Sequence, residues 1–189
     1  MAIKTVSIFG SSLPQEGSPA YEEARRLGRL LAEAGLAVCN GGYGGLMAAS
    51  ARGAREAGGH TIGVTCSLWS SAANRWITEE IRTLSFLERL TTLIARGDAY
   101  VVLPGGTGTL AELALVWEMM NKAALSRTVG GLKPLLVKIP YWQPVLECLN
   151  QESSLDGNDS PSTGRRRATE IVTLVADVHE VIEHLRKAL

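Results

Sequence analysis

The segment Pro104-Gly-Gly-Thr-Gly-Thr109 holds residues whose types and spacing suit chemistry on a ligand. It follows an apolar run and precedes a helix that we expect to begin at about Thr109. Glycines let a backbone turn tightly and approach a ligand with no Cβ in the way, and the free N–H groups of a helix start then form an anion site, most often for phosphate. The predicted phosphate-binding residues are Gly105, Gly106, Thr107, Gly108 and Thr109, the threonines as hydroxyl donors.

Glu112 follows about one turn into this predicted helix and is therefore close to the same site. A phosphate site alone disfavours a carboxylate, but a site that also acts on a sugar could use one to hold ribose hydroxyls or to move a proton. The alternative is a glutamate near a helix start that only interacts favourably with the helix dipole. Position alone does not separate these two interpretations.

Two earlier segments of small residues also follow predicted strands. The strand Thr5–Phe9 runs into Gly10, and Leu36–Cys39 runs into the glycine turn Asn40–Gly45. The carboxyl ends of parallel strands lie along one sheet edge, where ligands bind. The first turn could be ordinary, but the second repeats the arrangement of strand, glycine turn and helix, which favours a ligand role for both. The candidate ligand residues here are Gly10, Ser11, Ser12, Gly41, Gly42, Gly44 and Gly45.

The glycine turns do not match the motifs of larger nucleotide ligands. Neither turn completes G-x-G-x-x-G, and no G-K-[ST] supplies a P-loop lysine. A single nucleotide therefore fits better than NAD or ATP.

Hydrophobic periodicity predicts strands that alternate with helices along the chain. The expected strands are 5–9, 36–39, 60–64, 99–103, 134–138 and 171–176, and the expected helices are 19–34, 46–57, 85–96, 110–124, 142–150 and one capped by Asp177. Residues 79–84 are ambiguous. This order predicts an α/β fold, a three-layer, doubly wound, mostly parallel sheet of the Rossmann-like kind, in a single domain spanning 1–189. Residues 153–164 are predicted to form a mobile loop, and Arg165–Arg167 either meet phosphate or are solvated.

Several large side chains leave alternatives open. Arg89 falls at the flank of the apolar stripe of helix 85–96, so it either reaches the crevice or covers apolar surface with its stem. The irregular stretch 66–78, with Trp69 and Trp76, could be a flap near the site or part of a subunit interface. Trp117, Met119 and Met120 pack in the core or form a dimer face. Together these apolar side chains predict a homodimer.

Composition excludes several classes of partner. Lys+Arg and Asp+Glu both number 19, so the zero formal net charge predicts no nucleic-acid or membrane-surface binding. No apolar run could span a bilayer and no secretory pattern opens the chain, so we expect a cytoplasmic protein. The cysteines number 3, lie far apart and read as reduced core thiols. The histidines show no metal-ligand spacing, and we predict no metal.

The glycine segment and the glutamate after it resemble a known family. Pro104–Thr109 followed by Glu112 matches the PGGxGTxxE motif of the LONELY GUY (LOG) family, cytokinin riboside 5′-monophosphate phosphoribohydrolases. Gly10–Ser12 resembles the family's first-strand turn, Asn40–Met47 its GGGxxGLM segment, and Arg89 falls where the family has its catalytic arginine. The resemblance covers nearly the whole chain.

The resemblance implies a homodimeric hydrolase without a cofactor. Such an enzyme cleaves the N-glycosidic bond of a nucleoside 5′-monophosphate, AMP or an N6-substituted AMP, to a free base and ribose 5-phosphate. Arg89 and Glu112 would be catalytic, and Met47 would join the ligand-binding residues. The alternative is a carrier or sensor for a nucleotide or a molybdenum cofactor, because related binding proteins share the fold and turns. Only the enzyme needs Arg89 and Glu112 together, which favours it.

The chain departs from the family pattern at two positions near the site. Leu90 stands where the family usually has a lysine after its arginine, and Asn40 stands where it commonly has glycine.

Overall fold

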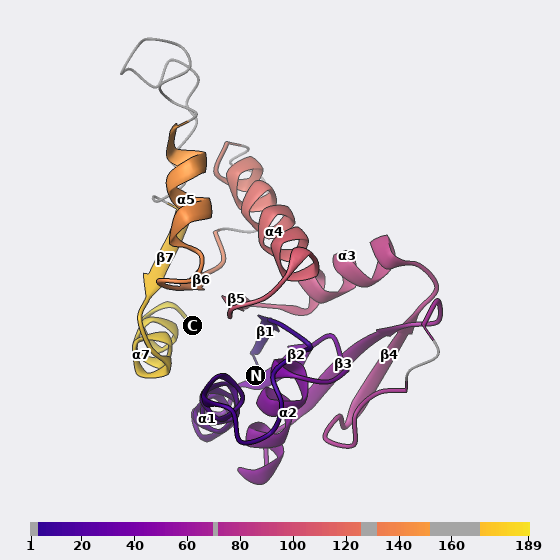
Figure 1. The fold of residues 1–189 in the computed structure, drawn as a ribbon. Coiled ribbons are helices and arrows are strands. Elements are labelled where there is room, and N and C mark those ends of the chain that lie inside the picture. The colour runs from indigo at the N-terminus through magenta and orange to yellow at the C-terminus, as the bar shows by residue number, and fades with distance from the viewer. Residues whose placement is uncertain (1–3, 70–71, 126–131, 152–170) are drawn as a thin grey trace.

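The computed structural model describes residues 4–69, 72–125, 132–151 and 171–189 (Figure 1). The described strands are β1 (Thr5–Phe9), β2 (Ala37–Asn40), β3 (Thr61–Cys66), β4 (Glu79–Thr83), β5 (Ala99–Val102), β6 (Leu135–Lys138) and β7 (Val172–Val175). The described helices are α1 (Pro19–Glu33), α2 (Leu46–Glu56), α3 (Phe86–Arg96), α4 (Thr107–Leu125), α5 (Gln143–Asn150) and α7 (Val178–Ala188). The expected mobile loop 153–164 and Arg165–Arg167 lie outside the described residues.

The strands form one seven-stranded parallel sheet in the order β4-β3-β2-β1-β5-β6-β7. The predicted doubly wound α/β fold is therefore confirmed. The chain builds outward from β1 to β4 on one side and then returns to β5 beside β1, where Ile8 pairs with Val101. The strand order reverses between β1 and β5, and open parallel sheets bind ligands at the carboxyl end of such a point.

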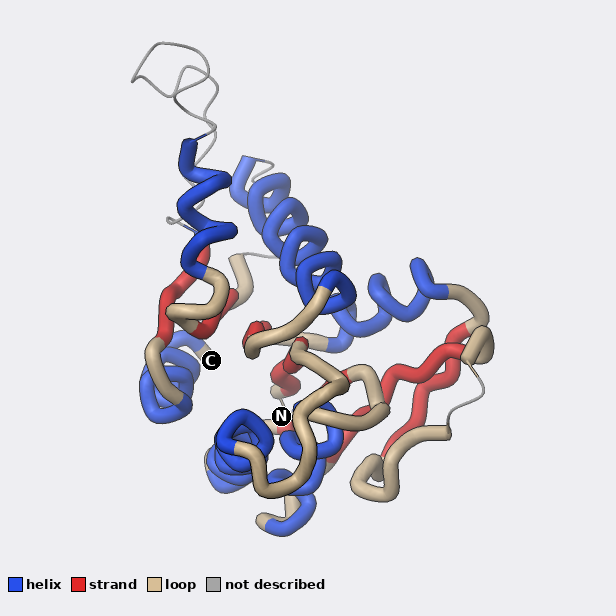
Figure 2. The backbone as a smooth tube through the Cα atoms, viewed as in Figure 1, coloured by secondary structure: helices blue, strands red, loops and turns tan. Residues whose placement is uncertain are grey.

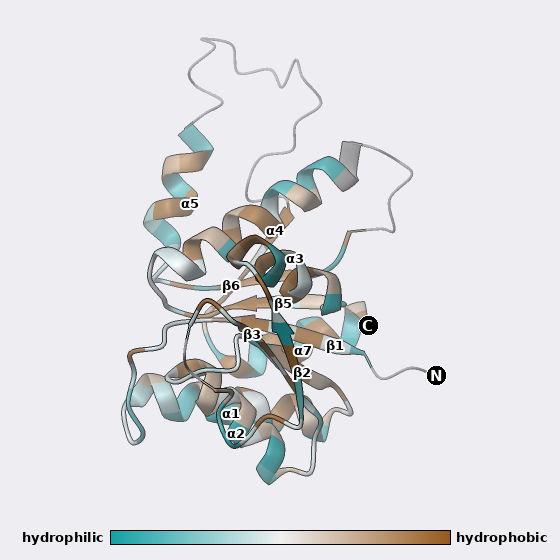
Figure 3. Ribbon diagram, turned by 90° about the vertical axis from the view of Figure 1, so that its right-hand side faces the viewer, coloured by the Kyte–Doolittle hydropathy of each residue, from teal (hydrophilic) through white to brown (hydrophobic). Residues whose placement is uncertain are grey.

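Helices cover both faces of the sheet, as the two views in Figures 1 and 3 show, with apolar residues concentrated between the layers. Along β1, Val6 and Ile8 pack into one hydrophobic cluster with residues of α1, α2 and α7. Phe9 packs into the other, with residues of α3, α4 and α5. Successive side chains of a strand point to opposite faces, so one buried strand contributes to both clusters.

Two elements differ from the sequence-based expectation. Residues Glu79–Thr83, left ambiguous by the sequence, form β4, an edge strand paired with β3 from Ile62↔Glu79 to Cys66↔Thr83. Its charged side chains hide the apolar pattern, and such charges are typical of edge strands. Helix α4 begins at Thr107, earlier than the expected Thr109, so part of the glycine segment belongs to the first helical turn.

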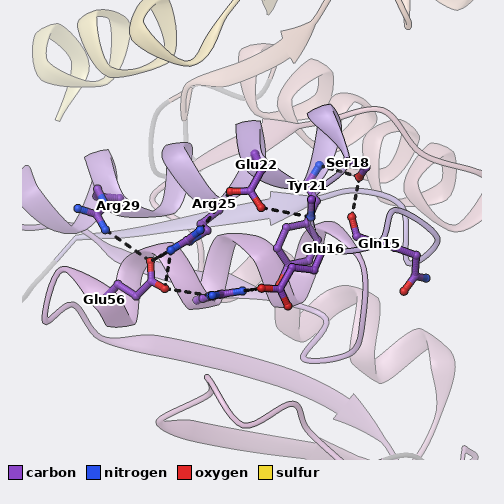
Figure 4. Close-up of polar contacts among 10 residues, drawn as sticks. Gln15, Glu16, Ser18, Tyr21, Glu22, Arg25, Arg29 and Glu56 are labelled. Carbon is purple, nitrogen blue, oxygen red and sulfur yellow. Dashed lines mark hydrogen bonds and ion pairs between the residues drawn. The ribbon is translucent and has the colours of Figure 1, made fainter.

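Helices α1 and α2 lie against each other at unusually close range. A Cβ at Gly28 would overlap the backbone of Ser50, and a Cβ at Gly53 would overlap the backbone carbonyl of Arg25. Across the same contact Arg25 donates from Nε to a carboxylate oxygen of Glu56 at 2.8 Å, and Figure 4 shows these side chains between the two helices. This contact holds the middle and the carboxyl end of α2 against α1.

The fold hides part of the apolar surface from which we inferred a dimer. Trp117 and Met120 are buried in the second cluster, whereas Met119 is exposed. Trp76 lies beside the guanidinium groups of Arg52 and Arg75. The homodimer remains a prediction. Within the described residues no helix combines the length and apolar character needed to cross a membrane.

Replacement of Gly53 by alanine should destabilise the fold, because the new methyl group must push α1 away from α2. Overpacking of this kind costs typically about 1–3 kcal/mol. Gly108→Ala is the matched control, since a Cβ there meets open space. Urea unfolding should give a lower midpoint for Gly53→Ala alone, and equal midpoints for the two variants would contradict the close approach.

Candidate functional site

Three turns meet at the carboxyl edge of the sheet, in the middle of the view in Figure 2. The Ser11 N–H donates to the Pro104 C=O at 3.0 Å, which joins the turns after β1 and β5. The Leu46 N–H donates to the Ser11 C=O at 2.8 Å, which joins the start of α2 to the same turn. Gly45, with φ of 62°, packs so closely on Ser11 and Ser12 that a Cβ would overlap them. The three predicted ligand segments therefore form one surface.

The turn between β5 and α4 presents free backbone donors. The Leu110 N–H donates to the Gly106 C=O at 2.9 Å, so the N–H groups of the three preceding residues have no partner in the helix. Cβ atoms at Gly106 and Gly108 would meet open space, and both residues are exposed. Thr107 is exposed, but Thr109 is buried. The segment Gly105–Thr109, which we call the anion turn, remains the candidate anion site. The buried side chain of Thr109 packs against Gly105 within it.

In the segment Gly105–Thr109 the glycines are needed because they lack a side chain, rather than because the backbone has an unusual φ angle. None of Gly105, Gly106 and Gly108 has a positive φ, whereas Gly42 and Gly45 in the second turn do. A Cβ at Gly105 would overlap the side chain of Thr109. The expected tight turning is thus a property of the second glycine turn, and Gly105 allows Thr109 to pack.

The second glycine turn is built around other residues as much as around a ligand. A Cβ at Gly41 would overlap the guanidinium of Arg89 and lie 2.6 Å from the sulfur of Met47. The buried Asn40 amide donates to the Met47 C=O at 2.9 Å and accepts from the Gly42 N–H at 2.9 Å. Asn40, the departure from the family pattern, therefore fixes the shape of this turn. Gly44 is exposed at its tip.

Arg89 is buried beside the second glycine turn and Glu112, so its charged end does not lie on a solvated flank of α3. It is only 6% exposed, and its Nε donates to the Val64 C=O at 2.9 Å. Its Cζ lies 5.6 Å from the centre of the Tyr43 ring and 5.5 Å from that of Trp69, within range of cation–π attraction. Its neighbour Leu90 is buried as part of the apolar stripe of α3.

Glu112 lies opposite Arg89 and is 8% exposed. Arg89 Nη1 is 3.6 Å from Glu112 Oε1, close enough for an ion pair but too long for a hydrogen bond. Burial raises the pKa of Glu112 to about 7, and the positive charge of Arg89 offsets part of that rise. At neutral pH such a group can both take and give a proton, as the catalytic interpretation of Glu112 requires.

Sequence reasoning missed three aromatic side chains that hold this site, Tyr43, Tyr141 and Trp142; a fourth, Trp69, lies in the stretch 66–78 that was expected to form a flap near the site or part of an interface. The Tyr43 hydroxyl accepts from the Cys66 N–H at 2.9 Å, which fixes the ring beside Arg89, and Trp69 contacts the Tyr43 ring edge-on at 5.8 Å. After β6, Tyr141 and Trp142 donate to backbone carbonyls next to the anion turn. Each follows the carboxyl end of a strand, and this position was the available signal.

No group of histidine, cysteine, aspartate or glutamate side chains that could hold a metal ion occurs among the residues described. The site instead combines backbone donors with one buried cation–carboxylate pair, on a doubly wound sheet of the class that binds nucleotides and related ligands.

The chain belongs to the SLOG cluster4 family, whose model matches residues 3–138. It is similar to a cytokinin riboside 5′-monophosphate phosphoribohydrolase of Rhodococcoides fascians, 28% identical over 192 residues that cover 97% of this chain and 89% of that protein. A Mycobacterium tuberculosis protein of the same name is 35% identical over 116 residues, 60% of this chain and 62% of that protein. The resemblance to the LOG family is thereby confirmed.

Among solved structures, the chain is similar to the molybdenum cofactor binding protein of Rippkaea orientalis, with a TM-score of 0.73, 20% identity and coverage of 99% of this chain and 98% of that one. The molybdenum cofactor carrier protein of Chlamydomonas reinhardtii gives a TM-score of 0.66 at 22% identity, with coverage of 99% and 98%. At these identities the likeness concerns the fold.

Replacement of Glu112 by glutamine should stabilise the protein at alkaline pH more than at acid pH. The pKa of Glu112 is raised from 4.5 to about 7 in the folded state, so wild-type stability falls as pH rises through this window while that of the glutamine variant does not. At 1.36 kcal/mol per pKa unit the difference reaches about 3 kcal/mol at most. Thermal unfolding between about pH 5 and about pH 8 measures it.

Glu118→Gln on the same helix is the matched control, because its carboxylate is exposed and paired with Lys122. It gives the size of an ordinary surface-charge effect. A Glu112→Gln effect that is equal to this control, or that shrinks as pH rises, would contradict the buried and proton-binding state of Glu112.

Proposed function

We propose that this protein hydrolyses the N-glycosidic bond of a nucleoside 5′-monophosphate and releases a free base and ribose 5-phosphate. The single observation that carries the proposal is the buried pair of Arg89 and Glu112, 3.6 Å apart, next to a turn of free backbone donors. The preferred substrate class is AMP or an N6-substituted AMP, as the names of the similar proteins from Rhodococcoides and Mycobacterium suggest.

The turn from Gly105 to Thr109 would hold the 5′-phosphate. Its backbone donors and the positive end of the α4 dipole favour a dianion without a metal. The exposed glycines leave room for the phosphate oxygens to approach the backbone closely. The turns at Gly10–Ser12 and Gly41–Gly45 would line the rest of the nucleotide.

Departure of the base builds oxocarbenium character on the sugar and negative charge on the base. The Glu112 carboxylate can stabilise the first and take a proton from the attacking water, whose oxygen bonds to C1′ as the electron pair of the C1′–N bond leaves with the base. The proton that Glu112 takes then returns, through water, to the departing base, which leaves as the neutral free base and restores the carboxylate. The positive guanidinium of Arg89 can offset the charge on the base or the phosphate. A Glu112 pKa of about 7 matches proton transfer near neutral pH.

A carrier without chemistry would need the turns but not this pair. The similarity to molybdenum cofactor binding proteins supports only the shared fold, at 20% and 22% identity. A buried carboxylate beside a buried guanidinium carries a desolvation cost that binding alone does not require. The pair therefore favours the hydrolase over the carrier.

Replacement of either side chain of the pair should abolish most of the turnover. Glu112→Gln and Arg89→Lys should each lower kcat on the order of a hundredfold, the usual effect of a positioned catalytic group. Lysine keeps the charge of the buried Arg89 but lacks its planar fork. Release of adenine from AMP measures the effect, with circular dichroism as the check on folding.

The matched controls are Glu118→Gln and Arg96→Ala, exposed partners in ion pairs on the same two helices. Both should keep wild-type turnover. Tight nucleotide binding by the wild-type chain, with no base released from a panel of purine and pyrimidine nucleotides, would eliminate the hydrolase and leave the carrier.

Replacement of Gly106 by valine tests the phosphate site separately. A Cβ there meets no protein atom, and the backbone of Gly106 has no positive φ, so the variant should fold normally. Its side chain would project into the open space above the turn and exclude phosphate. Calorimetry should find no AMP binding, and an unchanged affinity would move the phosphate elsewhere.

A further inference from the structure

The backbone carbonyls of the anion turn are held one after another by different parts of the chain. The indole Nε1 of Trp142 donates to the Leu103 C=O at 2.9 Å. The Pro104 C=O accepts from the Ser11 N–H at 3.0 Å. The Gly105 C=O accepts from the Tyr141 hydroxyl at 2.8 Å. The next carbonyl, that of Gly106, accepts from the Leu110 N–H within α4.

The direction of each carbonyl also fixes the direction of an N–H group. A trans peptide is planar, and its C=O and N–H point in opposite directions. The Gly105 carbonyl points toward Tyr141, so the Gly106 N–H of the same peptide points away from Tyr141. Likewise the bond from Ser11 to Pro104 sets the direction of the Gly105 N–H.

We propose that Tyr141 is a positioning residue for anion binding: its hydroxyl holds the Gly105–Gly106 peptide in the orientation that presents the Gly106 N–H to a phosphate. The inference rests on the phosphate site of the proposed function, but not on the hydrolysis. Tyr141 acts through the backbone, and the ligand that it serves is the phosphate group common to inorganic phosphate and nucleoside monophosphates.

The surroundings of Tyr141 suit this role. The residue follows β6, and its ring contacts that of Trp142 edge-on at 5.1 Å. Trp142 is buried and bonded to Leu103, so it anchors the segment. Tyr141 itself is 54% exposed, so it contributes little to the core. The Tyr141 hydroxyl bonds directly to the carbonyl oxygen of the Gly105–Gly106 peptide.

The test compares Tyr141→Phe with Tyr100→Phe. Tyr100 is a matched control, since its hydroxyl also donates to a backbone carbonyl at 2.8 Å, that of Ile94, but within the core. Calorimetry with inorganic phosphate and with AMP gives the affinities, and thermal unfolding gives the stability. Tyr141→Phe should weaken both ligands by the same factor, about three- to tenfold for one lost hydrogen bond, with an unchanged melting temperature.

Tyr100→Phe should do the reverse, with a lower melting temperature and unchanged affinities. If the full chain also hydrolyses AMP, Tyr141→Phe should raise KM and leave kcat nearly unchanged. Weaker AMP binding with unchanged phosphate binding would mean that the hydroxyl touches the nucleoside, and this would overturn the positioning role.

Two further results would also overturn it: unchanged affinities in Tyr141→Phe, or equal losses of affinity in both variants. Phosphate binding that depends on Tyr141 in a protein that releases no base would overturn the proposed hydrolysis alone. A wild-type chain that binds neither phosphate nor AMP would overturn the anion turn and this inference together.

Discussion

The site depends on one buried positive charge. The Arg89 guanidinium is buried beside the second glycine turn, and a buried charge is stable only if its environment replaces water. The Val64 carbonyl accepts one of its hydrogen bonds, the faces of Tyr43 and Trp69 flank it, and Glu112 faces it. Even the absence of a Cβ at Gly41 belongs to this arrangement, because that position is filled by the guanidinium.

Glu112 is the member of the pair whose protonation state can change near neutral pH. Its distance of 3.6 Å from Arg89 leaves the pair without a direct hydrogen bond. The attraction is therefore too weak to cancel the cost of burial, and the pKa of Glu112 rises to about 7. A shorter contact would hold the glutamate as a permanent carboxylate and remove its ability to exchange a proton. The raised pKa is thus a consequence of burial, which the charge of Arg89 offsets only in part.

Much of this arrangement could be predicted from the sequence. Apolar runs of β-branched residues give the central strands, and glycines that follow two of them give the turns at one sheet edge. Edge strand β4 could not be predicted from periodicity, because Ile81 is its one apolar residue and its pairing with β3 is a tertiary contact. Helix α4 starts at Thr107, within the glycine segment, where the side chain of Thr109 packs so closely on Gly105 that a Cβ there would overlap it. Periodicity does not mark such a contact.

The aromatic residues around the site were harder to predict for a physical reason. Tyr43 and Trp69 contact Arg89 from other segments of the chain. Tyr141 contacts Gly105 across a separation of 36 residues in the sequence. No local period marks such contacts. What the sequence does mark is the position of each residue after the carboxyl end of a strand, and that position alone brings them to the same edge.

The division of labour between backbone and side chains bears on how function varies on this fold. The proposed phosphate site consists of backbone donors and glycine positions, so many substitutions elsewhere leave it intact. The proposed chemistry rests on the Arg89 and Glu112 side chains. Loss of that pair would leave a protein that still binds a phosphate-bearing ligand, with the same fold and turns. Binders and hydrolases can therefore share one architecture, and under the proposed function the buried pair of Arg89 and Glu112 would be what makes this chain a hydrolase.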